Sequence, residues 1–465
     1  MSLRLPDPGN GVPEDKTGDD EHTMWLKTRD NFIDIDGELK RISDNLSPEL
    51  TDIGVAGELG FGTGVTDALP PGMYPMVGTN IRGHENYGNY RYSDGSVMCY
   101  VPMFYYRWGN GSSPNYAKYG VNACDVKPKD YFASVAAAKL EGYAVHRAFY
   151  DDGRLQDGFF VDKFQCSNND GTASSVKNGI PLSSSGSNAP FSGLTGSAGN
   201  NLAGSIDAVK TRGANFFPTT IFIQRALSLL SMAHAQASTS SAACAWYDAS
   251  GVNNFPKGCN NNALRDVNDT SVVYEETGYS SAGKTGSGQP FAKTTHNGQA
   301  SGVADLNGNM YEVALGLTQT DGNFYTLKTT TKAAALTSGA TLATDAWGTA
   351  AMTASYDSLG ASYGELTGES RNFAIGSTTK QVFSSANSGL AWAASCAGIP
   401  MLGGSDGTNA FGNDRFYDNR VEDLCALVGG TWSSSTIAGI WIVTGLNSRS
   451  NSNNSRGVRA ALYFV

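Results

Sequence analysis

The chain has 465 residues, a formal net charge of −10, 56 glycines and only 16% charged residues. This length allows two or three domains with sizeable cores, and the many glycines predict frequent turns and short strands. The negative charge argues against nucleic acid and anionic membranes as partners, because both require basic patches. An uncharged polar surface suits carbohydrate or protein recognition.

The first 22 residues contain no apolar core after a basic start, so we expect no secretory signal. No stretch of sequence approaches the length of a membrane-spanning helix. We therefore expect a protein made in the cytoplasm, where it stays or is built into a particle. The seven cysteines are odd in number and form no CxxC pair, so we expect free, mostly buried thiols.

The chain begins with an arm, residues 1–50, that is rich in Pro, Gly and Asp at its start. Within it, Met24–Leu46 has loosely spaced apolar residues among charges, which fits either a short self-associating helix or a solvated arm. Residues 51–96 are rich in Gly and Tyr and predict a connector of loops and short strands.

Regular structure is expected from residue 97 onward. Val97–Trp108 predicts a strand or strand pair at a sheet edge, because Pro102 interrupts it. Gly142–Phe149 and Asp157–Phe164 predict two further strands. Residues 167–205 are nearly all Ser, Gly and Asn and predict a long insertion without core residues.

Residues 216–234 carry the clearest helical pattern. Pro218 lies near its start, Thr219 or Thr220 can cap it, and the apolar residues follow helical spacing, so we expect a helix covering one face of a sheet. Ala242–Tyr247 predicts a second, short helix. Residues 320–380 are weakly patterned and are interpreted as an elaboration of the domain.

The last 37 residues, 429–465, change character twice. Two glycines and Trp432 open them, an apolar stretch follows, and Asn447–Ser455 holds only Asn and Ser apart from one Arg. Asn and Ser favour irregular loops, because their side chains bond neighbouring backbone groups. Residues 457–465 are apolar and predict a buried closing strand. The polar run is either a connecting loop or a binding site on a rigid scaffold.

This C-terminal stretch resembles the variable region of C-type-lectin-fold proteins that are diversified by retroelements, a group that includes the major tropism determinant of a phage tail fibre. The resemblance lies in the GGxW opening, the Ala-Gly-Ile step, the Asn-Ser-Arg-Ser-Asn-Ser run and the closing Gly-Val-Arg-Ala-Ala-Leu. More distantly, it is similar to formylglycine-generating-enzyme-like domains, in which an aromatic residue usually stands where Val458 stands here.

The resemblance implies an α+β, C-type-lectin-like (formylglycine-generating-enzyme-like) domain with long loop insertions over residues 97–465. The N-terminal region before it would serve for attachment. By resemblance, the solvent-facing ligand-binding positions are Ser433, Ser434, Thr436, Ile437, Trp441, Val443 and Asn447. Trp432 is expected in the core, Trp441 either in the core or exposed as an aromatic anchor, and Arg459 on a buried carboxylate or carbonyl.

A second motif, residues 305–312 (DLNGNMYE), resembles a turn that holds calcium in the formylglycine-generating family. Carried over by position, the ligands would be Asp305, the carbonyls of Gly308 and Met310, and Glu312. Ca²⁺ prefers such all-oxygen ligation. The alternative is a scaffold turn in which the two carboxylates bond backbone amides.

Catalysis is not expected. Formylglycine-generating enzymes use a cysteine pair before the final Arg-containing strand, and residues 447–459 contain no Cys. The five histidines are single and far apart, without the spacing of metal ligands, and no GxSxG motif is present.

The expected function is therefore that of a non-catalytic receptor-binding protein at the tip of a phage tail fibre. Its expected partners are a bacterial cell-surface receptor, protein or glycan, and other virion tail proteins at the N-terminus. We expect a homotrimer in the virion, synthesised in the host cytoplasm and not inserted into a membrane. The alternatives are a formylglycine-generating-type oxidoreductase and a bacterial surface binding protein with the same variable domain.

Overall fold

The structure, a computed structural model, describes residues 50–196, 198–249, 255–320, 323–339, 355–360, 371–401, 407–418 and 423–464. Nearly all of the predicted arm, residues 1–50, lies outside this described part, as does much of the predicted elaboration between residues 320 and 380. Residues from Asp52 onward form one unit, and only this unit is described below.

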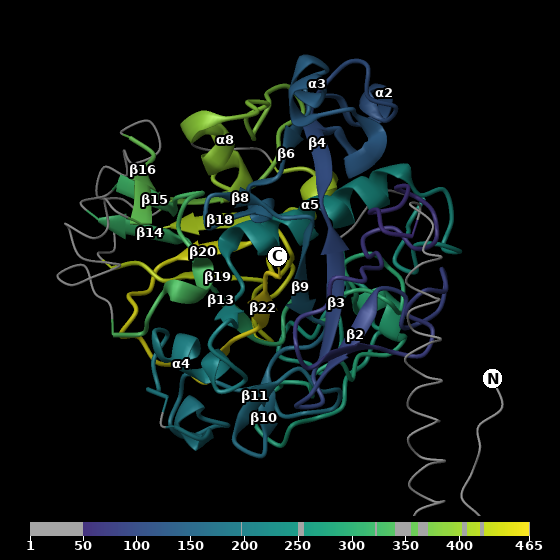
Figure 1. Cartoon of the computed structure of the whole chain (residues 1–465). Helices are drawn as coiled ribbons and strands as arrows, with labels where there is room; N and C mark the ends of the chain where they lie inside the picture. Colours follow the sequence, from purple (N-terminus) through teal and green to yellow (C-terminus); the bar gives the residue numbers. More distant parts are fainter. Residues whose placement is uncertain are drawn as a thin grey trace, which may run out of the picture. The chain divides into compact units, whose positions relative to one another are not determined.

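The first large sheet is antiparallel and has six strands. In spatial order they are β1 (Met73–Pro75), β2 (Asn89–Tyr92), β3 (Val97–Pro102), β9 (Gly158–Asp162), β22 (Ala460–Leu462) and β12 (Phe217–Pro218). Figure 1 shows β22, from the C-terminal end of the chain, beside β9 from its first half. The residues of β9 and β22 are buried throughout, which agrees with the apolar run Phe159–Val161 in β9 and the apolar residues of β22. A buried closing strand is therefore confirmed, but it spans only Ala460–Leu462 of the predicted residues 457–465.

The second large sheet is mixed. Its order is β17 (Arg371–Ala374), β18 (Arg415–Asp418), β20 (Val443–Gly445), β19 (Ala426–Val428), β13 (Tyr311–Ala314) and β21 (Arg456–Gly457). The pairs β18–β20 and β13–β21 are parallel, and the other pairs are antiparallel. Both C-terminal strands β20 and β21 belong to this sheet, so the last residues of the chain contribute to both large sheets.

Smaller elements surround these sheets. The remaining strands form sheets in the orders β5 (Cys124–Pro128), β4 (Phe104–Trp108), β6 (Ala144–Val145); β14 (Leu317–Thr320), β15 (Asn323–Leu327), β16 (Tyr356–Ser358); β10 (Ser167–Asn169), β11 (Thr172–Ser174); and β7 (Tyr150–Asp151), β8 (Arg154–Leu155). The α-helices within the described ranges are α2 (Tyr116–Tyr119), α3 (Val135–Leu140), α4 (Gly204–Lys210), α5 (Ile221–Ala237) and α8 (Gly389–Cys396). Short 3₁₀ helices span Gly120–Asn122, Lys129–Tyr131, Arg147–Phe149, Phe191–Gly193, Phe291–Thr294, Ala333–Ala335 and Asn409–Phe411. This mixture confirms the α+β class.

Helix α5 begins where its sequence predicts. The Thr220 hydroxyl accepts a hydrogen bond from the Ile223 amide at 3.2 Å and so caps the first turn. The helix packs against β5, β19 and α8, and nearly all of its side chains are buried. It is therefore enclosed by the fold. The expectation that it covers one face of a single sheet is wrong.

A buried ion pair joins the two large sheets. Arg459, directly before β22, places Nη2 2.7 Å from Oε1 of Glu312 in β13, and its Nη1 donates to the Asp162 carbonyl at the end of β9. Gln165 and Gln224 donate to the same Glu312 carboxylate at 3.1 and 2.8 Å. The expectation that Arg459 holds the final strand through a buried carboxylate is confirmed. Losing one partner of such a pair typically costs about 3–5 kcal/mol.

Several local predictions are wrong. β3 lies inside its sheet, between β2 and β9, and not at an edge. Pro102 is its last residue, where the missing amide hydrogen costs little. Of residues 142–149, only Ala144–Val145 form a strand, because a 3₁₀ helix follows. Residues 242–247 form turns and no helix.

The predicted insertion, residues 167–205, contributes to the core after all. Leu182, Phe191, Leu194 and Leu202 are buried, and the first three pack in a cluster that includes Phe160 of β9. These apolar residues are too widely spaced to form a pattern in the sequence. Strand β2, within the predicted connector 51–96, pairs directly with β3 of the predicted domain.

Candidate ligand-binding site

A loop at residues 431–438, the display loop, follows β19 through two glycines. Gly429 and Gly430 both have positive φ, 88° and 80°, which L side chains rarely adopt. A Cβ on Gly430 would also lie 2.9 Å from Cβ of Ala438. The bend into the loop therefore requires glycine.

Backbone hydrogen bonds fix this loop to other segments. The Trp432 amide donates to the Asn309 carbonyl at 2.9 Å, and the Trp432 carbonyl accepts from the Asn262 amide at 2.7 Å. The Trp432 ring is buried and meets Tyr279 edge-on, with 6.3 Å between ring centroids. The prediction of Trp432 as a core residue is confirmed, and its ring anchors the display loop.

The display loop presents the first four predicted ligand positions. Ser433 and Thr436 are exposed, and Ile437 retains 37% of its accessible surface. Ser434 is half-buried, and its hydroxyl accepts a hydrogen bond from the Thr431 amide at 3.1 Å. A small polar and apolar patch thus stands on a fixed backbone.

The other three predicted ligand positions are buried, so the expectation that Val443 and Asn447 face solvent is wrong, and of the two alternatives for Trp441 the core position is the one observed. Trp441 is 2% exposed and packs on Phe383, Phe411 and Trp108, with ring centroids 5.2–5.9 Å away. The Arg225 guanidinium lies 5.7 Å from the centre of the Trp441 ring. Trp441 is therefore a core residue.

Val443 and Asn447 both lie where the backbone bonds to neighbouring segments. Val443 belongs to β20 and pairs with Val428 of β19 and Phe416 of β18, at 1% exposure. The Asn447 carbonyl accepts a hydrogen bond from the Cys425 amide at 2.8 Å. The apolar stretch that contains Trp441 and Val443 therefore fills the second sheet's core.

The Asn/Ser run, residues 447–455, is tied to an earlier part of the chain. The Leu202 amide donates to the Asn451 carbonyl at 2.9 Å, and the Ser452 hydroxyl donates to the Ser184 carbonyl at 2.6 Å. Exposed side chains remain at residues 450–453. This run is therefore a surface loop whose backbone is held by the earlier segment.

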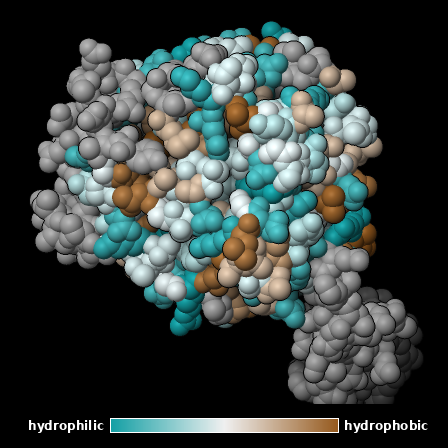
Figure 2. Space-filling view, turned by 90° about the horizontal axis from the view of Figure 1, so that it is seen from above, coloured by the Kyte–Doolittle hydropathy of each residue, from teal (hydrophilic) through white to brown (hydrophobic). Residues whose placement is uncertain are grey.

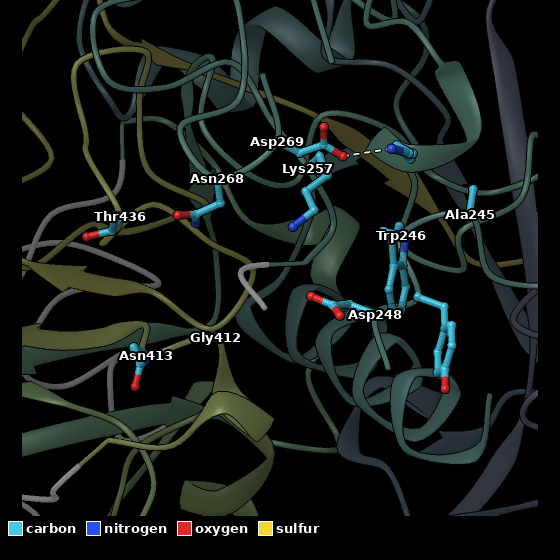
Figure 3. A pocket seen from close by; sticks show the side chains of 11 residues that line it. Ala245, Trp246, Asp248, Lys257, Asn268, Asp269, Gly412, Asn413 and Thr436 are labelled. Carbon is cyan, nitrogen blue, oxygen red and sulfur yellow. Dashed lines mark hydrogen bonds and ion pairs between the residues drawn. The ribbon is translucent and has the colours of Figure 1, made fainter. Parts of the chain in front are cut away.

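A cavity of about 630 Å³ lies beside the display loop and is shown in Figure 3. Pockets for small molecules commonly have such volumes. The cavity is lined by side chains from separate stretches of the chain: Ala245, Trp246, Tyr247, Asp248, Lys257, Asn268, Asp269, Lys293, Gly412, Asn413 and Thr436. Thr436 is the one predicted ligand residue among them.

The cavity wall carries charges of both signs. Lys293 and Asp269 form an ion pair of 2.7 Å, and the pKa of Asp269 is lowered by the hydrogen bond from Lys293, against the effect of its partial burial. Burial lowers the pKa of Lys257, and the carboxylates of Asp266, Asp269 and Asp248 oppose this effect. In Figure 3 the Lys257 amino group and the Asp248 carboxylate point into the same space.

An aromatic side chain forms one side of the cavity. Trp246 donates its indole N–H to the Thr295 carbonyl at 2.9 Å and stacks on Phe255 at 4.9 Å. Its polar atom is therefore used inside the fold, and the residue as a whole is only 3% exposed. Apart from Thr436, the residues that line the cavity were not predicted from the sequence. They lie in polar loops, without periodicity or motif, and only the fold brings them together.

The donor set of the predicted calcium turn does not fit a cation. Glu312 is bound by Arg459, and the Met310 carbonyl accepts from Gln165 at 3.1 Å. Asp305 is buried, and its Oδ2 accepts from the Gly286 amide at 2.6 Å. A guanidinium on a ligand carboxylate would repel Ca²⁺. Among the described residues, no group of three or more His, Cys, Asp or Glu could hold a metal ion.

The structural role of this turn is clear from its backbone. Gly308 has a φ of 74°, and a Cβ there would meet the Cys259 carbonyl at 2.1 Å. Its amide donates to the Gly429 carbonyl at 2.7 Å. The turn at residues 305–312 therefore supports the start of the display loop.

All seven cysteines are free and buried, as expected. Burial raises the pKa of the Cys396 and Cys425 thiols to about 12. The thiolate form, which binds metals and attacks electrophiles, is disfavoured at neutral pH for both.

Comparison of the chain with models of known protein families and with curated proteins gave no match. Of the helices in the described ranges, none is long and apolar enough to cross a membrane.

Proposed function

We propose that this chain is a non-catalytic receptor-binding protein at the tip of a phage tail fibre, built on a C-type-lectin-like domain. It recognises a bacterial cell-surface ligand through the display loop and the cavity beside it. The supporting observation is that Ser433, Thr436 and Ile437 are presented by a loop whose own backbone is held by glycines, Trp432 and hydrogen bonds. A surface of this kind tolerates side-chain changes without loss of the fold.

The character of the surface supports recognition by polar contacts. In the view of Figure 2, hydrophilic and neutral residues predominate, and hydrophobic residues form small separate groups. A broad apolar face of the kind that obligate partners bury is not seen in that view. The display loop itself contains no ionisable side chain, so specificity depends on shape, hydroxyl groups and the apolar Ile437.

The test is binding of the purified full chain, labelled with a fluorophore, to a panel of bacterial strains. The double substitution Ser433→Ala with Ile437→Ala is expected to reduce binding to the recognised strains at least tenfold. The matched control is Ser93→Ala with Ile180→Ala, which removes an exposed Ser and an exposed Ile elsewhere. Equal binding by both double variants, or binding to no strain by the wild-type chain, would overturn the proposal.

A further inference from the structure

The cavity beside the display loop has the chemistry of a sugar site. We propose that it binds one saccharide unit of a bacterial surface glycan, with Asp248 and Asn268 as hydrogen-bonding residues and Tyr247, beside the buried Trp246, as the aromatic side of the site. This inference rests on the proposed function and narrows its ligand from a receptor of either kind to a glycan.

The first argument is shape. The space is a cavity of about 630 Å³ lined by separate loops, whereas protein receptors are usually bound over flatter areas of about 800 Å² on each partner. A single sugar unit projecting from a polymer can enter such a cavity. A folded protein surface would have to supply a protruding side chain or loop.

The second argument is charge. An anionic ligand would meet Asp248 and Asp269, and a cationic one would meet Lys257 and Lys293. Since Asp269 and Lys293 are already paired with each other at 2.7 Å, neither sign of charge dominates. A neutral ligand therefore avoids repulsion that an ion of either sign would suffer.

The third argument is the mixture of donors and acceptors. Asp248 offers acceptors, Lys257 offers donors, and the side-chain amides of Asn268 and Asn413 offer both. A sugar hydroxyl is one donor and two acceptors, so neighbouring hydroxyls can satisfy such a mixed lining. Figure 3 shows these four side chains placed around the space and not on one side of it.

The fourth argument is the aromatic wall. The indole N–H of Trp246 is bonded to the Thr295 carbonyl, so the part of the ring at the cavity is apolar. Sugar rings have apolar C–H faces as well as polar edges. Because Trp246 is only 3% exposed, the accessible aromatic surface for such a face comes mainly from the half-buried Tyr247.

The experiment is isothermal titration calorimetry of the purified full chain with N-acetylglucosamine, N-acetylgalactosamine, galactose, mannose and rhamnose. The variants are Asp248→Ala and Asn268→Ala, both at exposed positions whose truncation leaves the core untouched. The control is Asp130→Ala, an exposed carboxylate that does not line the cavity. Circular dichroism melting verifies that all three variants fold.

We expect saturable heat with at least one sugar. Asp248→Ala or Asn268→Ala should weaken this binding at least tenfold, and Asp130→Ala should leave it unchanged. Absence of heat with every sugar overturns the sugar site, as does binding that neither cavity variant weakens. The cell-binding test separates this failure from that of the proposed function. Cells bound by a chain that binds no sugar indicate a protein receptor, whereas a chain that binds a sugar but no cells contradicts the receptor-binding role.

Discussion

The display loop and the segment that follows it differ sharply, although the resemblance assigned both to one ligand surface. Residues 433–437 reach solvent, whereas Trp441 and Val443 retain only 2% and 1% of their accessible surface. The difference arises because Trp441 packs on three aromatic rings and Val443 lies in β20 (Val443–Gly445), between β18 and β19. The display loop belongs to no strand. A ligand surface can therefore change residue by residue in the loop, while the adjoining segment must keep its packing.

The largest loss of stability is expected in the buried segment that follows the display loop. Trp441→Ala removes a ring packed on Phe383, Phe411 and Trp108 and leaves the Arg225 guanidinium without its aromatic partner. We expect the free energy of unfolding to fall by about 3–5 kcal/mol, measured by urea denaturation. A loss below about 1 kcal/mol would show that Trp441 is not a core residue.

Asp414 connects the buried segment with the cavity, since it accepts a hydrogen bond from the Trp441 amide at 2.7 Å and directly follows Asn413 of the cavity wall. Burial raises its pKa to about 7 from a usual 3.8, and the Arg225 charge opposes the rise. A raised carboxyl pKa stabilises the fold below pH 4, and this contribution is lost as pH rises through 7.

Asp414→Asn is therefore expected to gain stability over the wild-type chain as pH rises from 4 to 7. The gain is at most about 1.4 kcal/mol per pH unit. Urea denaturation at several pH values measures it, with Asp130→Asn, at an exposed position, as control. A difference independent of pH, or one that grows on acidification, would contradict the raised pKa.

Gly430→Ala tests the entry to the display loop. Its positive φ costs about 1–2 kcal/mol for an L residue, and the contact with Ala438 adds to that cost, so we expect a loss of about 2 kcal/mol or more. Gly278→Ala is the matched control, because Gly278 has a φ of 88° and open space around its Cβ. If both variants lose the same stability in thermal melts, the contact with Ala438 contributes nothing.

The smallest effect is expected in the display loop itself. Ser433→Ala and Thr436→Ala should each change the free energy of unfolding by less than about 0.5 kcal/mol, because both side chains are exposed. Val443→Ala, a few residues further on, should cost about 1–3 kcal/mol by loss of buried surface. The same urea denaturation measures all three variants. Similar losses of unfolding free energy at all three positions would contradict the distinction between an exposed display loop and a buried segment after it.

The sequence predicted the features that local chemistry determines. Short-range pattern predicted the Thr220 cap, the buried closing strand and the core position of Trp432. The cost of leaving a buried charge unpaired predicted the kind of partner that Arg459 has. Features that depend on distant pairing were missed. The position of β3 inside its sheet requires β9, which lies much further along the chain.

The candidate site shows the same limit. The display loop could be predicted because its residues are consecutive, but burial of Trp441 could not, since its packing partners come from three remote segments. The cavity combines Asp248, Lys257, Asn268 and Asn413 from loops that carry no pattern. For the turn at residues 305–312, the sequence left a calcium site and a scaffold turn open, because the guanidinium that binds Glu312 lies far away, at residue 459.

The most direct measurement of the central proposal is deep sequencing of this coding region across the natural population that carries it. Substitutions concentrated at residues 433–437, with Gly429, Gly430, Trp441 and Arg459 unchanged, are the predicted result. Such a pattern would mark a diversified ligand surface on a fixed scaffold. A uniform display loop, or substitutions equally frequent at Trp441 and Val443, would contradict it.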